Sequence, residues 1–222
     1  MIEIVPVLLP ETFDEISTHA ARVRGLVKRM QIDIVDGVFA ESLTWPYVND
    51  TGDFERLTHE DEGLPFWDEL DFEVDMMVQN PEEVLPKWIS AGVSACIIHI
   101  GSTKNYDAII EKCKTADIEA GLAIRPGTAP EEFEPLIKKF DFVQVMGSDT
   151  IGHAGLELDE YVYAKISDIR AKHSELSIAV DIGVNEDTAP QLIEAGATKL
   201  VAGSAIFGSD DIKETIEYLK NL

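Results

Sequence analysis

The sequence predicts a single (β/α)₈ barrel that spans residues 1–222. Three observations lead to this fold class. Short runs rich in β-branched residues alternate with amphipathic helical patterns, which is typical of βα units built around a parallel sheet. About eight such units fit the chain, and eight parallel strands suit a closed barrel better than an open sheet. The length of 222 residues is also that of one such barrel.

Most of the expected strands are apolar on both faces. This is typical of parallel strands that are covered by helices on one side and by a barrel core on the other. By residue number we expect the strands at 3–8, 29–35, 72–78, 95–99, 119–124, 142–146, 177–181 and 199–202.

The helical patterns carry boundary signals. Asn80 and Asn185 are expected to cap the helices that follow them. Pro86, Pro135 and Pro190 fall roughly one turn inside helical patterns, where each is expected to remove a backbone hydrogen bond and to kink its helix. The polar segment 51–70 interrupts the alternation, and we expect an irregular second helix there, followed by an extended loop.

Composition limits the classes of partner. The net charge of −24, from 42 acidic against 18 basic residues, argues against nucleic acid and anionic membranes as partners. The acidity fits either simple solubility or a cytoplasm of high salt, where charge repulsion is screened. Cys96 and Cys113 have no metal-ligand spacing and are expected to be buried thiols in a reducing compartment. With no signal-peptide pattern and no apolar run long enough for a bilayer, a cytoplasmic location is expected.

Three carboxylates stand near the C-terminal ends of expected strands, where barrels of this kind place their chemistry. Asp33 lies on the second strand, Asp75 on the third and Asp181 on the seventh. Strand alternation places Gln31 on the same inward face as Asp33. A buried Asp33 could form a structural hydrogen bond to a neighbouring strand, but three converging carboxylates require a cation or bound protons.

Two glycine-containing turns follow the last two expected strands. Gly183 precedes a helix, and Gly203 with Ser204 can open a short one. Loops in these two positions form the common phosphate site of such barrels, because glycine lets backbone N–H groups approach the phosphate oxygens. Each turn alone could be a plain helix cap, and only their pairing indicates a phosphate site.

Five motifs resemble signatures of the ribulose-phosphate 3-epimerase family, and the resemblance extends over nearly the whole chain apart from the segment 51–70. They are DIVDGVF at 33–39, LTWP at 43–46, AIRPGT at 123–128, VDIGVN at 180–185 and VAGSAIF at 201–207.

The resemblance implies a reaction and a ligand. Members of that family remove the proton beside the ketone of a pentulose phosphate and return it on the other face, through a metal-stabilised enediolate. The family's acid/base and metal-binding aspartates match Asp33 and Asp181. The resemblance therefore implies a small phosphorylated sugar as the ligand, a divalent metal as the cofactor and a homo-oligomeric assembly.

The sequence departs from the family pattern around the same pocket. Gln31 and Asp75 stand where the family has its two metal-site histidines. By this resemblance Gln31, Asp33, Asp75 and Asp181 would make an all-oxygen site, which favours magnesium, manganese or calcium over zinc. Val7 replaces a serine that touches the substrate, and Ile182 replaces a glycine of the strand-7 pair. The residues expected to support the substrate are Val7, Met77, His99, Met146 and Ile182.

The resemblance also assigns a phosphate loop after the sixth strand. Its glycine-rich pattern is changed here to Gly152, His153, Ala154 and Gly155. His153 could contact the phosphate, act as an acid or simply be exposed. His99 ends the fourth strand and is expected to face the pocket. The remaining histidines are expected at the surface, and they are His19, His59 and His173.

Three functions follow as hypotheses. The first is an epimerase with an oxygen-only metal site. The second is a catalytically silent relative that binds a sugar phosphate or a partner protein, which the replaced residues favour and the retained Asp33 and Asp181 disfavour. The third is a barrel lyase such as a hexulose-phosphate synthase. It ranks last, because the lysine that those enzymes carry shortly after the strand-3 aspartate has no counterpart after Asp75.

Overall fold

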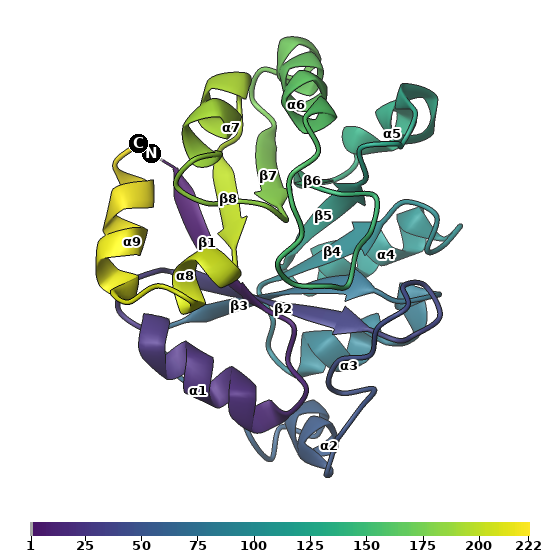
Figure 1. Ribbon diagram of the computed structural model, residues 1–222. Coiled ribbons are helices and arrows are strands. Elements are labelled where there is room, and N and C mark those ends of the chain that lie inside the picture. Colours follow the sequence, from purple (N-terminus) through teal and green to yellow (C-terminus); the bar gives the residue numbers. More distant parts are fainter. Residues whose placement is uncertain (1) are drawn as a thin grey trace.

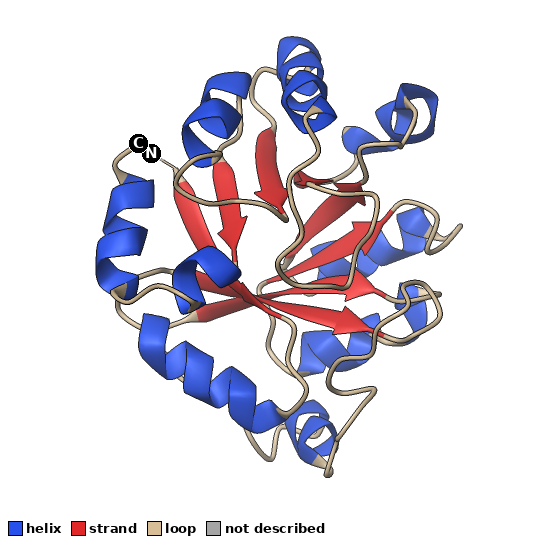
Figure 2. Ribbon diagram, in the orientation of Figure 1, coloured by secondary structure: helices blue, strands red, loops and turns tan. Residues whose placement is uncertain are grey.

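Eight parallel strands close into a barrel in the order in which they occur along the chain. The computed structural model describes residues 2–222. Figure 1 and Figure 2 show the strands at the centre with the helices arranged around them. The strands are β1 (Glu3–Leu8), β2 (Arg29–Val35), β3 (Asp71–Met77), β4 (Ala95–His99), β5 (Glu119–Ile124), β6 (Phe142–Met146), β7 (Ser177–Asp181) and β8 (Lys199–Ala202).

The strand predictions are confirmed, with a shift of one residue in β3. That strand was expected at 72–78 but begins at Asp71, which pairs with Arg29 of β2, and it ends at Met77, which pairs with Val35. The backbone N–H of Asp71 donates to the carbonyl of Lys28 at 3.0 Å, and this bond starts the pairing one residue early.

The helices lie outside the strands, and a short 3₁₀ helix, η1, follows β3. They are α1 (Phe13–Val23), α2 (Asp53–Thr58), η1 (Pro81–Glu83), α3 (Leu85–Ser90), α4 (Tyr106–Thr115), α5 (Pro130–Ile137), α6 (Tyr161–Lys172), α7 (Ala189–Ala195), α8 (Ser204–Phe207) and α9 (Ile212–Lys220). Among residues 2–222, no helix has the length and apolar character needed to cross a membrane.

Two of the three proline predictions are wrong. Pro86 and Pro190 lie in the first turn of α3 and α7, where the missing N–H has no intrahelical partner in any case. Only Pro135 lies inside its helix, α5.

Both asparagine caps are also wrong. Asn80 adopts a left-handed backbone with φ of 53° and forms no side-chain cap. Asn185 instead closes a turn, where its Oδ1 accepts from the N–H groups of Asp187 and Thr188, and α7 begins at Ala189.

The segment 51–70 has the predicted form of a short helix, α2, followed by irregular chain. Its polar residues face solvent, and three leucines fix it to the core: Leu57, Leu64 and Leu70, each at most 2% exposed. These anchors hold a segment that has no regular structure over most of its length.

Two apolar layers hold the barrel together. The outer layer fills the space between strands and helices, with side chains such as Ile32, Val74 and Leu122. The inner layer fills the barrel itself and includes Val5 and Ile97. Because successive side chains alternate across each strand, polar residues on the inward face are carried into the barrel interior, where the candidate site lies.

Candidate active site

The candidate site is a cavity of about 210 Å³ at the C-terminal ends of the strands. Nearly all the residues proposed from the sequence line it: Val7, Asp33, Met77, Met146, Gly152, His153, Ala154, Gly155, Asp181, Ile182, Gly183, Gly203 and Ser204. Three others, Gln31, Asp75 and His99, are buried and lie outside this lining. Gln31, Asp75 and His99 therefore form a buried polar layer behind the residues that line the cavity.

Three carboxylates meet at the deep end of the cavity. Asp33, Asp75 and Asp181 each offer an oxygen, and these oxygens lie within 4.8 Å of one another. Asp33 and Asp75 are direct partners in the β2–β3 register. Closure of the barrel through β8 and β1 brings Asp181 of β7 to the same place. The three residues are 3%, 0% and 4% exposed, so water screens their charges poorly.

Asp75 is held by two neighbouring side chains. One carboxylate oxygen accepts from His99 Nε2 at 2.7 Å, and the other accepts from Gln144 Nε2 at 2.9 Å. The other ring nitrogen of His99, Nδ1, is buried and has no hydrogen-bond partner among the described residues. His99 was expected to face the pocket, but it supports Asp75 from behind the lining.

Gln31 contributes an amide group to the carboxylate cluster. Its Nε2 donates to Asp33 Oδ1 at 2.8 Å, and its Oε1 is buried without a hydrogen-bond partner among the described residues. Rotation of the amide by half a turn would exchange the two atoms and direct the oxygen toward the carboxylates. Gln31 is therefore placed where it can either donate to the cluster or serve as a further oxygen ligand.

Burial and mutual repulsion raise the pKa of both carboxyl groups that line the cavity. The pKa of Asp33 is raised well above its ordinary value, by burial first and then by the charges of Asp181 and Asp75. Burial and the charge of Asp75 raise the pKa of Asp181 to about 8, although its carboxylate accepts a hydrogen bond from the N–H of Ile182. Without a cation, this cluster retains protons near neutral pH.

Ile182 has an unusual backbone for its residue type. Its φ is 77°, in the left-handed region that a β-branched side chain rarely adopts. Its N–H donates to Asp181 Oδ1 at 2.8 Å, so the strained residue also orients the carboxylate. Ile182 packs against the inner apolar layer and lines the cavity. Backbone strain of this kind is commonly retained where it positions a functional group.

The other end of the cavity is made of glycine-containing turns. Gly203 precedes α8, and a Cβ on Gly203 would lie 3.0 Å from the carbonyl oxygen of Val7. At Gly183, φ is 73° and a Cβ would lie 2.6 Å from the backbone nitrogen of Leu158. These close backbone contacts explain the glycines at both positions and leave backbone groups rather than side chains at this end.

The loop from β6 to α6 forms another part of the wall. Ser42 Oγ donates to the carbonyl of Gly152 at 2.5 Å, which fastens this loop to the β2–α2 loop. At Gly152, φ is 81° and a Cβ would lie 2.7 Å from Ser42 Oγ. The residues that follow, His153 and Ala154, are exposed at the protein surface and still line the cavity.

The surface prediction for the histidines is only partly correct. His59 is exposed as expected. The His173 side chain is only 10% exposed and lies 3.1 Å from Glu134. His19 lines the cavity from α1, which the sequence reasoning missed. One available signal was its position three residues after the buried Ile16, beside the apolar stripe of the helix.

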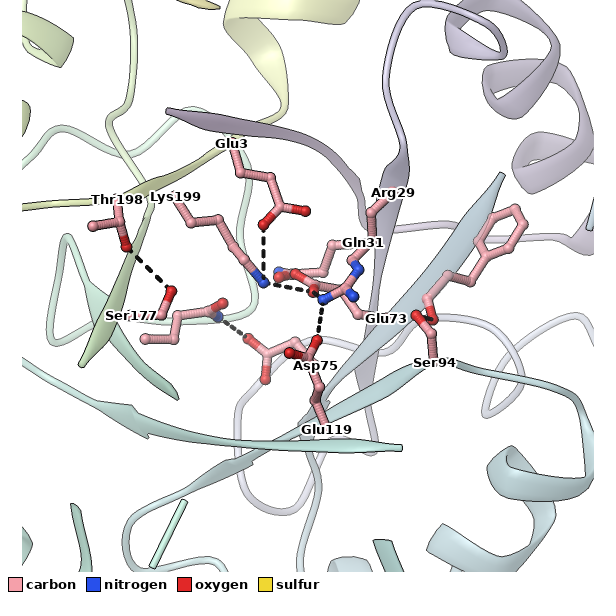
Figure 3. A network of polar contacts seen from close by, with 12 residues as sticks. Glu3, Arg29, Gln31, Glu73, Asp75, Ser94, Glu119, Ser177, Thr198 and Lys199 are labelled. Carbon is pink, nitrogen blue, oxygen red and sulfur yellow. Dashed lines mark hydrogen bonds and ion pairs between the residues drawn. The ribbon is translucent and has the colours of Figure 1, made fainter. Parts of the chain in front are cut away.

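A second buried polar cluster lies at the opposite, N-terminal end of the barrel (Figure 3). There Lys199 Nζ lies 3.0 Å from Glu73 Oε2, and Arg29 lies 3.2 Å from the same oxygen. Arg29 also lies 2.6 Å from Glu119. Each acid in this cluster has a basic partner, so it does not require an added cation.

The carboxylate cluster fits a divalent cation. Its oxygens are close enough to share one ion, its charges lack any lysine or arginine partner among the described contacts, and Gln31 Oε1 is an unpaired oxygen beside it. Asp75 keeps lone pairs on both oxygens, because each accepts only one hydrogen bond. Carboxylate and amide oxygens are the donors that hard cations prefer.

A family model and the curated relatives of this chain both point to the same family. The model of the ribulose-phosphate 3 epimerase family matches residues 3–207. A ribulose-phosphate 3-epimerase of Bacillus subtilis is 28% identical over 227 residues, covering 99% of this chain and 99% of the relative. The chloroplastic ribulose-5-phosphate-3-epimerase of Arabidopsis thaliana is 32% identical over 198 residues, covering 86% and 66%.

Among solved structures, the 3-hexulose-6-phosphate synthase of Salmonella typhimurium superimposes with a TM-score of 0.72 at 14% identity, covering 99% of this chain and 97% of that chain. At this level of identity the structural match concerns the fold alone.

Proposed function

Because the chain belongs to the ribulose-phosphate 3-epimerase family, a family of isomerases, we propose that it inverts the carbon beside the ketone of a pentulose phosphate. The observation that carries this proposal is the pair of buried carboxyl groups, Asp33 and Asp181, which are the only acidic side chains among the described residues that line the cavity. They stand at its deep end, where the reacting carbon of a bound sugar would lie.

Inversion by proton transfer requires one group that removes a proton and one that supplies a proton on the opposite face. Two carboxyl groups in one buried cluster meet this need, because repulsion between them disfavours the state in which both are charged. The raised pKa of Asp33 and of Asp181 therefore favours one protonated and one ionised member near neutral pH. We assign these two residues as the acid/base pair.

We assign the metal site to Asp33, Asp75 and Asp181, with Gln31 as a fourth oxygen donor. Since every donor is an oxygen atom, the site favours magnesium or manganese over zinc. When bound, such a cation would stabilise the negative charge that develops on the substrate oxygen as the proton is removed. His99 and Gln144 would fix the orientation of Asp75, as residues behind a metal ligand commonly do.

The phosphate of the substrate would occupy the glycine-containing end of the cavity. Gly183, Gly203 and Ser204 supply backbone groups there, and the loop 152–155 covers the same end. Support comes from the absence of bulky side chains at the two turns, where a Cβ would collide with neighbouring backbone. The sugar would then extend from the phosphate end to the carboxylate end.

The test is proton NMR of ribulose 5-phosphate in D₂O, which follows deuterium entry at C3. We expect exchange with magnesium or manganese, and its loss in both Asp33→Asn and Asp181→Asn. Asp168→Asn, at an exposed position on α6, is the matched control and should exchange like the wild type.

Absence of exchange with every metal, while the sugar phosphate still protects the protein thermally, would overturn the proposed reaction and favour the catalytically silent relative. Absence of both exchange and protection would also remove the proposed substrate.

A further inference from the structure

The ionisable side chains among the described residues that line the cavity are two aspartates and two histidines. Asp33 and Asp181 supply negative charge at the deep end. Among the described residues that line the cavity there is no lysine or arginine, and the bases are two histidines, His19 and His153. In a chain with a net charge of −24, an anionic ligand needs local positive charge. The two imidazoles are the side chains of the lining that can provide it.

His19 is fixed in place by α1 and α8. Its Nδ1 lies 2.8 Å from the carbonyl oxygen of Glu15, one turn earlier in α1. Its ring meets the ring of Phe207 edge-on, with centroids 4.6 Å apart and an interplanar angle of 89°. Arg22 donates to the Phe207 carbonyl at 3.1 Å and also lies over the same ring. These contacts hold His19 beside the helix that follows Gly203.

The bond to Glu15 determines what the ring can offer a ligand. A carbonyl oxygen only accepts, so Nδ1 of His19 carries the proton in this contact. In the neutral ring Nε2 then carries no proton and can only accept, so its lone pair would repel an anion. Nε2 can donate to an anion only when the ring is a doubly protonated imidazolium. Binding of an anion by His19 therefore requires a positive charge on its ring.

His153 reaches the same cavity from the β6–α6 loop. The contact of Ser42 Oγ with the Gly152 carbonyl, at 2.5 Å, fastens the loop immediately before it. The loop and α1 are far apart in sequence, so the cavity is lined by one histidine from each of two independently anchored elements.

We infer that His19 and His153 form the charged part of the phosphate site and clamp the dianionic phosphate of the substrate against the turn at Gly203. This inference rests on the proposed function, since it concerns the phosphate end of the same cavity. It makes His19 a specificity-determining residue that selects a phosphorylated sugar over the free sugar. It also predicts that the ligand binds together with a proton.

The charged surroundings of His19 are compatible with this role. On its own helix, the Glu15 carboxylate is engaged by the N–H of Glu11 at 2.9 Å, and Arg22 adds positive charge next to Phe207. The residues of α8, from Ser204 to Phe207, carry no ionisable side chain. Across α1, helix α9 carries the exposed pair Lys213 and Glu217, whose charges oppose each other.

The other ionisable side chains among the described residues that line the cavity are His153, Asp33 and Asp181. In the metal-loaded protein the two aspartates would bind the cation. The imidazoles of His19 and His153 would then be the positive charges that remain available to an anion.

The first test uses inorganic sulfate, which keeps two negative charges across the range where histidine titrates. NMR of the histidine rings and of the Gly203 amide would follow sulfate binding to the wild-type protein at about pH 6 and about pH 8. We expect the His19 and His153 signals to shift in a saturable way with one dissociation constant, while the exposed His59 does not respond. Binding should weaken roughly tenfold at the higher pH.

His19→Gln should bind sulfate roughly tenfold more weakly than the wild type at about pH 6 and should show a weaker pH dependence, because only His153 is left to titrate. His59→Gln is the matched control and should bind as the wild type. The inference is overturned if sulfate leaves the His19 signals unmoved in the wild-type protein, an outcome that needs no variant to fold. It is also overturned if His19→Gln binds sulfate normally.

Kinetics separates this inference from the proposed function. With ribulose 5-phosphate, His19→Gln should raise KM roughly tenfold and leave kcat nearly unchanged, whereas a purely structural defect would lower kcat as well. If the wild type shows no proton exchange but binds sulfate through His19, the proposed reaction fails and the anion site stands. If the wild type epimerises and His19→Gln keeps its KM, the anion site fails and the reaction stands.

Discussion

The two ends of the barrel bury acidic side chains in opposite ways. At the N-terminal end, Glu73 is fully buried and has both Lys199 and Arg29 as partners, within 3.2 Å. At the C-terminal end, Asp33 and Asp181 are almost as deeply buried but have no basic partner among the described contacts. A buried charge is tolerated only when it is paired, protonated or bound to a cation. The paired end therefore supports the fold, and the unpaired end is available for chemistry.

The aromatic neighbour of Lys199 strengthens this contrast. Lys199 Nζ lies 4.2 Å from the ring centroid of Phe142, and that ring fills the space above Gly121, where a Cβ would lie 2.4 Å from it. The N-terminal end is thus closed by packing as well as by ion pairs. The C-terminal end keeps a cavity next to its acids. Substitutions at the two ends should consequently separate stability from activity.

The largest expected effect is on catalysis at the open end. Asp181→Asn should slow deuterium exchange at C3 by a factor of about 10² to 10⁴, because it removes one member of the proposed acid/base pair. The metal-free variant should be at least as stable as the wild type at neutral pH, since the change removes an uncompensated buried carboxyl group. Exchange rates and thermal unfolding check the two parts. If Asp181→Asn lost stability and activity together, the C-terminal end would support the fold as well, and the contrast between the two ends would be contradicted.

The next largest effect is on stability at the closed end. Lys199→Met should destabilise the protein by about 3–5 kcal/mol, because Glu73 loses a buried partner. Exchange activity per folded molecule should be unchanged. Denaturant unfolding measures the first expectation and NMR the second, with Lys213→Met as the control at a 66% exposed position. Equal stability of the two variants would show that the buried pair does not hold the barrel.

A smaller effect concerns pH. In the folded, metal-free protein the pKa of Asp181 is about 8, against 3.8 as its ordinary value. The folded state therefore binds a proton that the unfolded chain releases, and the free energy of unfolding should fall as pH rises from about 4 to about 8. Thermal unfolding at intervals across this range, without metal, would measure the slope. Magnesium should restore stability at the high end by binding the ionised carboxylates.

Asp181→Asn should have a shallower slope than the wild type, while the control Asp168→Asn should keep the full slope. The same slope in all three proteins would assign the pH dependence to surface acids instead of the cluster.

The smallest expected effect tests backbone strain at the open end. At Ile182, φ of 77° suits glycine and strains any other residue. Ile182→Gly and Ile182→Ala both remove the side chain, but only glycine relieves the strain. Denaturant unfolding should show Ile182→Gly to be more stable than Ile182→Ala by roughly 1 kcal/mol. If alanine were equal or better, the left-handed backbone at this position would not be strained.

The barrel could be predicted from the sequence because its strands are continuous apolar runs. Period-two alternation placed Asp33 inside, and the position of Asp181 near the C-terminal end of the seventh strand placed it at the same end of the barrel. Helix starts were harder to predict. Asn80 has the residue type of a cap, but its left-handed backbone depends on how the chain leaves β3. Propensity describes one residue, whereas the observed boundary depends on its neighbours in space.

The site shows the same limit. The position of His99 at the end of the fourth strand predicted that it faces the pocket, but only the register of β3 and β4 shows that its Nε2 donates to Asp75. His19 lies beside the apolar stripe of α1, and nothing local indicates that Phe207, 188 positions later in the chain, packs on its ring. Contacts between residues far apart in sequence decided both cases.

The most direct test of the account is where deuterium appears at the start of the wild-type reaction in D₂O. If Asp33 and Asp181 act from opposite faces, each group exchanges with solvent separately. Early product should then carry deuterium at C3, while the remaining substrate should carry almost none. Transfer of the original proton into the product would instead indicate a single base serving both faces, and would contradict the assignment of these two carboxylates as an acid/base pair.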